Sequence, residues 1–249
     1  TATTYESWAV PAGQSQKSAT CRIRITDPSV PLSVGDYFYT DGTWSTELEE
    51  SKTVAGIVFA VADATSTDPK LATDFPQCTR GLVMSVNEYK SGIAMINDSA
   101  EGWTAVYNYA LNQGGFVDMA NTSVYCGYSN TMAMRAYKQD KGDYSKYLDV
   151  LDAHDVAVAG ASSWYLPSQY ELGLIASNYD AINARLEWVG TSLEDYSASY
   201  EGGGGTLIRR GMYWSSTYVY GLHNHSFPYK LSENSLSSEI HMHSLEYNL

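Results

Sequence analysis

The sequence predicts an α+β fold, with mixed antiparallel sheets and two or three helices. Three observations support this prediction. Asp41-Gly42 lies between β-forming residues, which is typical of a tight hairpin. Apolar and polar residues alternate near both ends of the chain, with the period of a strand. Ser168 and Glu171 have the spacing of a helix capping box.

The composition is that of a globular protein with a large acidic excess. The chain has 249 residues, 44% of them hydrophobic, and a formal net charge of −13. Phosphate contacts need clustered Lys and Arg, so a nucleic-acid partner is not expected, nor is an anionic membrane surface. No run of 18 apolar residues occurs, so membrane insertion is not expected either. No secretory leader is visible at the start of the sequence.

Tyrosine is unusually frequent, with 21 Tyr against five Phe. Tyrosine is enriched on surfaces that bind other molecules. It is equally common on half-buried strands of β-rich proteins. The composition leaves both interpretations open.

The elements expected before residue 160 are mainly strands followed by helices. Residues 1–33 are expected to be a separate N-terminal β segment, either a strand pair or the tail of a preceding module, in which Cys21, Ile23 and Ile25 alternate with polar residues before two prolines. Residues 34–249 form the main domain. We expect a hairpin from residues 37–40 and 43–45, with positive φ at both Asp41 and Gly42, further strands at residues 54–61 and 81–86, and helices at residues 105–112, 130–137 and 144–151.

The later elements begin with the capped helix. Ser168 is its expected N-cap, and residues 180–189 extend or follow it. Residues 202–205 are four glycines followed by Thr206 rather than by Gly-Lys-Ser/Thr, which predicts a mobile loop and not a phosphate site. Residues 227–231 and 240–243 alternate in polarity, which predicts a final hairpin with one apolar face.

Two predictions concern the interior. The core is expected to contain the large apolar residues of the strongest motifs, namely Trp164, Leu166, Leu172, Ile175, Tyr213 and Trp214. The three cysteines, Cys21, Cys78 and Cys126, fit no zinc-ribbon spacing. They allow either one disulfide with one free thiol or three buried thiols. If the protein is exported, Cys78 and Cys126 are the expected pair, because both lie inside the main domain.

Candidate chemistry points away from an enzyme. Residues 160–164 contain a serine but lack the second glycine of a nucleophile elbow. The His223/His225 and His241/His243 pairs have the spacing at which two imidazoles share one strand face and bind a metal, but we favour exposed histidines on a recognition face. An acidic triplet is interpreted as a solvated helix face and not as a cation site: Asp149, Asp152 and Asp155. We therefore expect no catalytic residues, no metal and no cofactor.

Three segments together carry a resemblance. They are residues 35–45 (GDYFYTDGTWS), 164–172 (WYLPSQYEL) and 213–217 (YWSST). In this order they resemble the C-type-lectin-like domain of gut-bacterial surface and fimbrial-tip proteins, from about residue 34 onward. The sequence has Phe227 and Glu246 where that family usually has a Trp and an Arg. The calcium-binding loops of classical lectins and the late cysteine pair of formylglycine-generating enzymes are absent.

The resemblance extends to the variable proteins of diversity-generating retroelements, including phage receptor-binding proteins. In those proteins the substituted positions follow a Trp-Ser-Ser-like segment and carry Tyr, His, Ser, Asp and Asn. The tail of this chain is rich in such residues: Tyr218, Tyr220, His223, Asn224, His225, Ser226, Asn234, Ser235, His241, His243, Tyr247 and Asn248.

These features predict a non-enzymatic, adhesin-like protein that binds a protein or glycan receptor on another cell or particle. The predicted ligand-binding residues are Tyr218, Tyr220, His223, Asn224, His225, Tyr229, Asn234, His241, His243 and Tyr247. All of them except Asn234 and Tyr247 are expected to form one exposed patch, in which Tyr229 is partly buried. The alternative is a structural pilus-tip or matrix subunit that docks a neighbouring protein. The expected location is extracellular or on the cell surface, with a phage virion as the alternative.

Overall fold

The computed structural model describes residues 30–86, 102–142, 146–153, 157–189, 212–218 and 228–230. The side chains of 102, 103, 146, 147, 150, 153, 212–214 and 228–230 are not described. Contacts divide the chain into residues 1–30 and 31–249, and everything below concerns the second unit. The predicted β segment at residues 1–33 lies almost entirely outside the described residues and stays a prediction.

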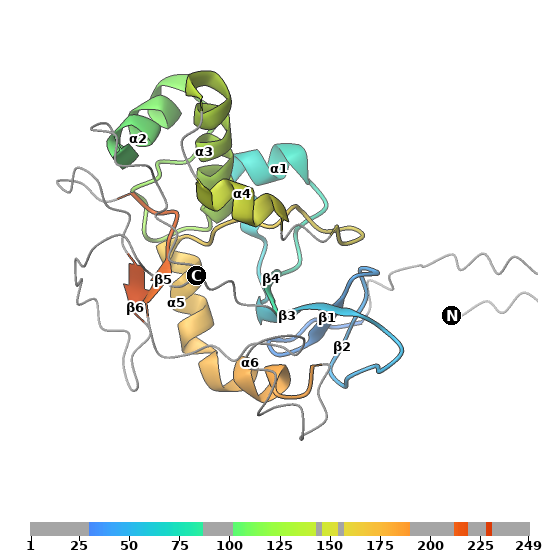
Figure 1. Ribbon diagram of the computed structural model, residues 1–249. Helices are drawn as coiled ribbons and strands as arrows, with labels where there is room; N and C mark the ends of the chain where they lie inside the picture. Colours follow the sequence, from blue (N-terminus) through green and yellow to red (C-terminus); the bar gives the residue numbers. More distant parts are fainter. Residues whose placement is uncertain are drawn as a thin grey trace, which may run out of the picture. The chain divides into compact units, whose positions relative to one another are not determined.

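The described part is a mixed fold with a small antiparallel sheet, so the α+β prediction is confirmed (Figure 1). Its strands are β1 (Tyr37–Tyr39), β2 (Trp44–Ser45), β3 (Val54–Ala60) and β4 (Leu82–Ser85), in the order β2-β1-β3-β4. A separate two-stranded sheet pairs β5 (Met212–Trp214) with β6 (Pro228–Lys230). The helices are η1 (Ala64–Ser66), α1 (Pro69–Asp74), α2 (Gly102–Gln113), α3 (Gly127–Lys141), α4 (Lys146–Ala153), α5 (Gln169–Ser177) and α6 (Tyr179–Leu186). The expected number of two or three helices is therefore too low.

The predicted hairpin is present, but its turn differs from the expectation. Gly42 has φ of 80°, while no described residue other than glycine has positive φ, so the expected positive φ at Asp41 is wrong. The Asp41 side chain instead accepts a hydrogen bond from the Thr43 N–H at 2.9 Å, which closes the turn locally. Tyr39, at the end of β1, is completely buried.

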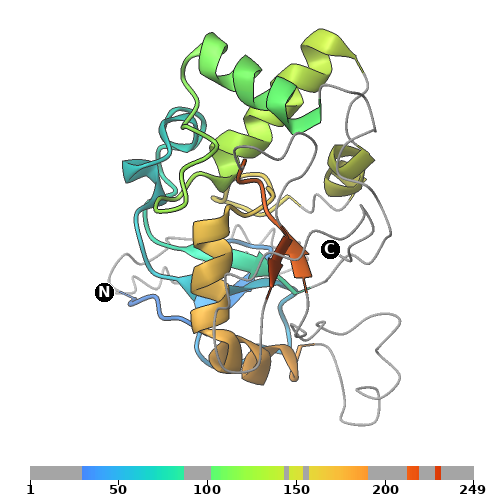
Figure 2. The same cartoon turned by 90° about the vertical axis from the view of Figure 1, so that its left-hand side faces the viewer.

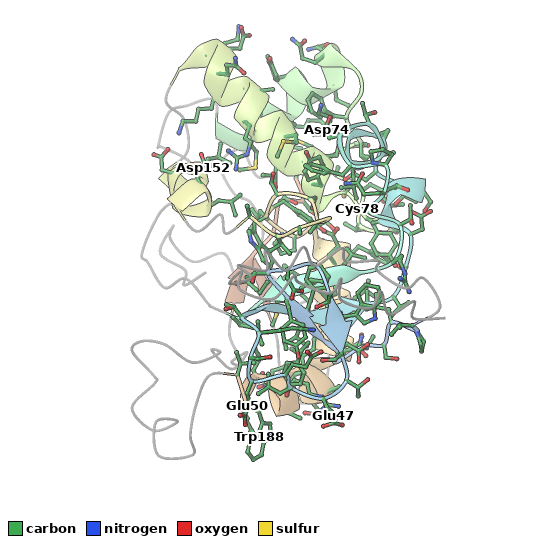
Figure 3. All side chains as sticks on the ribbon, turned by 90° about the vertical axis from the view of Figure 1, so that its right-hand side faces the viewer. Glu47, Glu50, Asp74, Cys78, Asp152 and Trp188 are labelled. Atoms are coloured by element: carbon green, nitrogen blue, oxygen red, sulfur yellow. The ribbon has the colours of Figure 1, made fainter. Side chains whose placement is uncertain are left out.

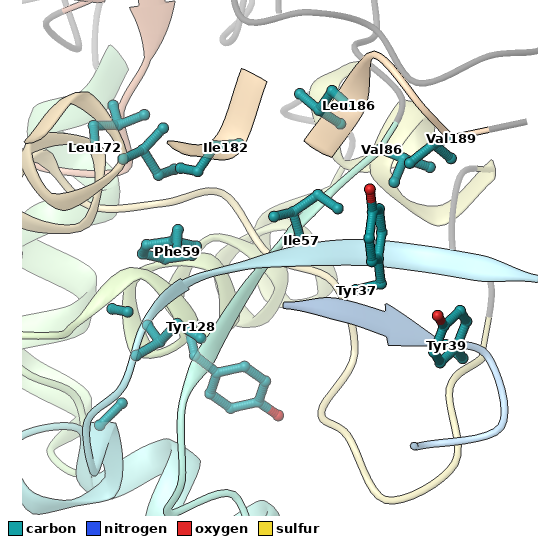
Figure 4. Packing of buried hydrophobic residues seen from close by; sticks show 14 of the residues in the cluster. Tyr37, Tyr39, Ile57, Phe59, Val86, Tyr128, Leu172, Ile182, Leu186 and Val189 are labelled. Carbon is teal, nitrogen blue, oxygen red and sulfur yellow. The ribbon is translucent and has the colours of Figure 1, made fainter. Parts of the chain in front are cut away.

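Helices α5 and α6 lie beside the sheet (Figure 2), and the main apolar core lies between the helices and the sheet (Figure 4). Strand β3 is central and nearly all buried, which explains its continuous apolar run. Ile57 and Phe59 project from it toward Leu172 of α5 and Ile182 of α6 (Figure 4). We name this cluster the sheet core; its buried members are Tyr37, Tyr39, Ile57, Phe59, Ala60, Ala64, Leu71, Leu82, Val86, Tyr128, Leu172, Ile175, Ile182, Leu186 and Val189.

Residues 180–189 follow the capped helix rather than extending it. Helix α5 ends at Ser177, and Asn178 separates it from α6. The Asn178 amide donates to the Phe59 carbonyl and to the Leu174 carbonyl, each at 3.1 Å. This side chain therefore ties the junction between the helices to the central strand.

Three of the six predicted core residues are confirmed. Leu166, Leu172 and Ile175 are buried, whereas Trp164 is only partly buried against a second apolar cluster formed largely by α2, α3 and α4. The side chains of Tyr213 and Trp214 are not described. Residues 202–205, and the predicted hairpin strand at 240–243, lie outside the described residues.

Candidate ligand-binding region

The first part of the candidate region is the capped N-terminus of helix α5. The Ser168 N–H donates to Glu171 Oε2 at 2.6 Å, and the Glu171 N–H donates to Ser168 Oγ at 3.3 Å, so the predicted capping box is confirmed. A capping-box glutamate is usually exposed, but Glu171 is 1% exposed. Its other oxygen accepts from the Tyr165 hydroxyl at 3.2 Å. Burial raises the pKa of Glu171 to about 7.

The first turn of α3 packs directly against this carboxyl group. Residues 127–131 (GYSNT) are all buried, although most of them are polar. A Cβ atom on Gly127 would lie 2.2 Å from Glu171 Oε2 and 2.9 Å from the Leu166 carbonyl oxygen. Position 127 therefore requires glycine because the neighbouring atoms leave no room for a Cβ atom, and not because its φ is positive.

A second buried carboxylate serves two helices. Asp68 accepts from the Leu71 N–H at 2.9 Å and thereby caps α1. Its other oxygen accepts from the Ser129 N–H of α3 at 2.8 Å. The Cys126 N-cap of α3 makes no side-chain cap hydrogen bond. Asp68, which is far from α3 in the sequence, provides the capping acceptor instead. Burial raises the pKa of Asp68 from its ordinary value.

Residues 215–218 are fixed by hydrogen bonds to these same elements. The Asn130 amide donates to the Ser216 carbonyl at 3.1 Å, and the Ser216 N–H donates to the Pro167 carbonyl at 2.8 Å. The Gln169 N–H donates to Thr217 Oγ1 at 2.9 Å. We call this buried set the polar hub: Asp68, Gly127, Ser129, Asn130, Thr131, Ser168, Glu171, Ser215, Ser216 and Thr217.

Backbone hydrogen bonds connect the segments that carry the three sequence motifs. The backbone hydrogen bond from Ser216 to Pro167 joins the 213–217 motif to the 164–172 motif. The Ala159 N–H donates to the Thr40 carbonyl at 3.3 Å, so the loop before the second motif touches the hairpin of the first. The three motifs therefore meet in one scaffold, and residues 215–218 are attached to it.

Tyr218, the first predicted binding residue, is not exposed as predicted. It is 5% exposed, and its ring stacks on Tyr107 with 4.2 Å between centroids. Its hydroxyl lies 3.2 Å from Thr104 Oγ1, and its N–H donates to the Met119 carbonyl at 2.8 Å. The prediction of exposure is wrong because α2 offers both an aromatic face and a polar partner for the hydroxyl. Tyr218 instead fixes the end of the attached segment.

The other predicted binding residues are not brought together by the described structure. Tyr229 lies in β6 opposite Tyr213, but its side chain is not described. The remaining residues lie outside the described part of the chain: Tyr220, His223, Asn224, His225, Asn234, His241, His243 and Tyr247. Their role in binding stays a prediction.

The acidic residues of α4 are used in ion pairs with α3. Asp152 Oδ1 lies 2.5 Å from Arg135 Nη2, and Asp149 Oδ1 lies 2.5 Å from Lys138 Nζ; Asp152 is labelled in Figure 3. Asp155 is outside the described residues. Among the residues that are described, no group of three or more His, Cys, Asp or Glu is placed to hold a metal ion. The same part of the chain contains no helix of the length and hydrophobicity that a bilayer requires.

The predicted disulfide between Cys78 and Cys126 is wrong. Both are free thiols, in different surroundings (Cys78 is labelled in Figure 3). Cys78 is partly buried beside the Gly160 carbonyl, whereas Cys126 is buried at the start of α3 near Asn130. Burial raises the pKa of both thiols, that of Cys126 to about 12, so both are protonated at neutral pH.

Comparison with known proteins finds similarity to fimbrial proteins of Bacteroides ovatus. No known family model matches the sequence. The chain is 26% identical over 215 residues to the "Putative fimbrium tip subunit Fim1C" of Bacteroides ovatus, covering 75% of this chain and 39% of that protein. A crystal structure of a fimbrial protein from the same species, 20% identical, superposes with a TM-score of 0.49, covering 75% of this chain and 41% of the other. The chain thus spans about two fifths of the length of the proteins it matches.

Proposed function

We propose that this chain is a non-enzymatic, fimbrial-tip type of surface protein that binds a protein or glycan receptor through the residues following Thr217. The observation that carries this proposal is the sequence similarity to the Bacteroides ovatus tip subunit over 215 residues. That similarity supports an extracellular or cell-surface location and a fimbrial subunit role.

The binding part of the proposal is supported by the way the tail is attached. Residues 215–217 are small, buried and hydrogen-bonded, so the segment that precedes the predicted binding residues has a fixed position. A rigid attachment lowers the entropy lost when the residues beyond it bind a ligand. The tail is rich in Tyr, His, Asn and Ser, which combine contact area with adaptable hydrogen bonding.

The proposal also includes the fold of the domain and the origin of the tail sequence. We infer a C-type-lectin-like arrangement from the three motifs, of which the second and third are joined in the polar hub. We also infer that the tail positions are open to retroelement diversification, because their residue types match those that adenine-directed mutagenesis of Asn codons produces. A template repeat beside a reverse-transcriptase gene in the source DNA is the expected finding. Its absence would remove diversification from the proposal and leave an ordinary adhesin.

The binding proposal is tested with paired variants of the whole chain. Tyr220→Ala combined with His223→Ala should abolish binding to host cells or to a glycan array, while the thermal unfolding midpoint stays unchanged. The matched control is Leu111→Ala, which trims an exposed apolar residue of α2 and should leave binding intact. Retained binding by the double variant would contradict the assigned residues.

The alternative function is a structural tip or matrix subunit whose tail docks a neighbouring subunit. The same double variant separates the two functions when it is expressed in the producing bacterium. An adhesin variant should still be incorporated into isolated fimbriae and should lose only receptor binding. A structural subunit with the same changes should be missing from those fimbriae.

A further inference from the structure

A strongly exposed tryptophan, Trp188, follows helix α6 and is labelled in Figure 3. It is 53% exposed, and it is the only aromatic residue among the large hydrophobic residues that are exposed in the described part of the chain. Aromatic side chains contribute most when they are buried, either in a core or in an interface. Neither the folding of α6 nor the proposed binding tail explains an indole in this position.

The backbone around Trp188 is fixed by its neighbours. Leu186 and Val189 are both buried in the sheet core (Figure 4). The Trp188 N–H donates to the Arg185 carbonyl at 3.1 Å, and the Val189 N–H donates to the Leu186 carbonyl at 3.3 Å. An exposed ring on a fixed backbone loses little further entropy when a partner binds to it. Trp188 is therefore suited to anchor an interface.

Carboxylates from the loop between β2 and β3 lie near this tryptophan. The Tyr37 hydroxyl donates at 3.4 Å to the Arg185 carbonyl, the same carbonyl that accepts from the Trp188 N–H. Glu47 is close enough to the Tyr37 hydroxyl to act on it electrostatically. Figure 3 shows Glu47, Glu50 and Trp188 at the same end of the described structure. An exposed aromatic ring and negative charge therefore occur together on this surface.

The cations of the same region already have other partners. Lys52 pairs with Glu49 at 2.6 Å, and the Arg185 guanidinium lies over a tyrosine ring of β1, 5.7 Å from its centroid. Among the residues that the structure describes, no ion pair includes Glu47 or Glu50. Both carboxylates are exposed and can therefore pair with a cation from another molecule.

We propose that Trp188, Glu47 and Glu50 form a docking surface for an arginine-bearing segment of a partner protein. A guanidinium group satisfies both parts of this surface, because its plane stacks on an indole ring and its edge donates two hydrogen bonds to a carboxylate. Lysine fits less well, because its ammonium group is a point charge without a planar face.

Other occupants fit this surface less well. The chain has a formal net charge of −13, so a second copy would approach these carboxylates against a general repulsion. In the described ranges, no three or more His, Cys, Asp or Glu are grouped to hold a metal ion. A neutral sugar would stack on the indole but would leave both charges without a partner. The surface includes no tail residue, so this inference goes beyond the proposed function and does not rest on it.

The test is an NMR titration of the whole chain with isotope-labelled tryptophan side chains. The probe is the peptide acetyl-Gly-Arg-Gly-Arg-Gly-amide, and its control replaces each arginine by citrulline, which has nearly the same shape but no charge. Loss of one indole signal in Trp188→Phe identifies Trp188 among the six tryptophans. We expect the arginine peptide to shift this signal saturably and more than the other indole signals. The citrulline peptide should bind about tenfold more weakly or worse.

Variants separate the ring from the charge, with titration calorimetry of the arginine peptide as the readout. Trp188→Ala removes the stacking surface, and Glu47→Gln combined with Glu50→Gln removes the charge. Each should weaken binding about tenfold without lowering the thermal unfolding midpoint, because all three side chains are exposed. The matched control is Asp140→Asn combined with Asp152→Asn, which makes the same change in net charge on α3 and α4 and should leave the affinity within about twofold.

Three results would overturn the proposal. One is a Trp188 signal that the arginine peptide shifts no more than the other indole signals. Another is an equal loss of affinity in the control variant, which would show that only net charge attracts the peptide. The third is dimerisation in sedimentation experiments that Trp188→Ala abolishes, which would assign the surface to a second copy of the chain. None of these results affects the receptor-binding proposal, which is tested on tail residues.

Discussion

The sheet core and the polar hub are both fully buried, but they are stabilised by different physics. The sheet core joins β3 to α5 and α6 through apolar contacts, which are roughly proportional to area and largely independent of direction. The polar hub joins α3, α5 and residues 215–218 through hydrogen bonds, each of which needs a particular donor and acceptor. Apolar burial supplies much of the stability, whereas the hub specifies where the tail segment attaches.

The largest expected effect is in the sheet core. Ile57 is completely buried, so Ile57→Ala should lower the free energy of unfolding by about 3–4 kcal/mol, and Ile57→Val by only about 1 kcal/mol. Denaturant unfolding of both variants provides the measurement. A graded response is the signature of apolar packing; equal losses from the two variants would contradict it.

The second largest effect is expected at Gly127, which packs closely against Glu171 in the polar hub. Gly127→Ala should cost about 3 kcal/mol, because the added carbon would overlap Glu171 Oε2 and crowd the Leu166 carbonyl. The control is Gly115→Ala, where φ is 80° but no atom lies within 4 Å, so that only backbone strain of about 1 kcal/mol is expected. Similar unfolding midpoints for the two variants would rule out the steric explanation.

Global stability should depend on pH through the hub and not through the sheet core. The folded state raises the pKa of Glu171 from 4.5 to about 7, so its contribution is present below pH 4.5 and is lost as pH rises through 7. The upper limit of the loss is about 3 kcal/mol. Urea unfolding at pH 5 and pH 8 measures it, and stability that rises over this range would contradict the assignment.

A smaller effect is expected at Asn130, which donates to Ser216. Asn130→Ala should cost about 2 kcal/mol, because it leaves the buried Ser216 carbonyl without this donor. The control is Gln139→Ala on the exposed side of α3, with an expected change near zero. If both variants unfold at the same denaturant concentration, the hydrogen bond contributes nothing to stability.

The smallest effect is expected at the surface, where α4 is paired with α3. Arg135 and Asp152 are partly exposed, so Asp152→Ala should cost about 0.5 kcal/mol or less. The loss should be smaller still in 1 M salt, because screening weakens such pairs. A loss above 2 kcal/mol that is insensitive to salt would show that α4 depends on this contact in another way.

The sheet core could be predicted from the sequence better than the polar hub, for a physical reason. The β-forming runs and the Asp41-Gly42 turn are local signals that need only a few neighbouring residues, and so is the Ser168 cap, the part of the hub that the sequence does reveal. The hub depends on partners far apart in the chain: Asp68 pairs with Ser129 across 61 residues, and Asn130 with Ser216 across 86. No local pattern marks GYSNT as a buried segment, so the predicted helix began at 130 and not at Gly127.

The errors have related causes. Tyr218 was predicted to be exposed because tyrosine suits both surfaces and interiors, and only the position of Tyr107 decides between them. The Cys78–Cys126 pair was predicted from chain position, which does not bring two sulfur atoms together. Helix α1 was missed because it has only six residues and is stabilised by Asp68, a cap that it shares with α3.

The dependence of the polar hub on residues 215–218 has a consequence for biosynthesis. During translation, the sheet strands and helices α1 to α6 emerge before these four residues do, so they must wait with Asn130, Pro167 and Gln169 lacking their partners. The segment that completes the interior is also the one that leads into the proposed binding tail. A nascent chain that stops short of Ser215 should therefore keep these hydrogen-bonding groups accessible to water, and it should be cleaved by proteases faster than the chain that carries residues 215–218.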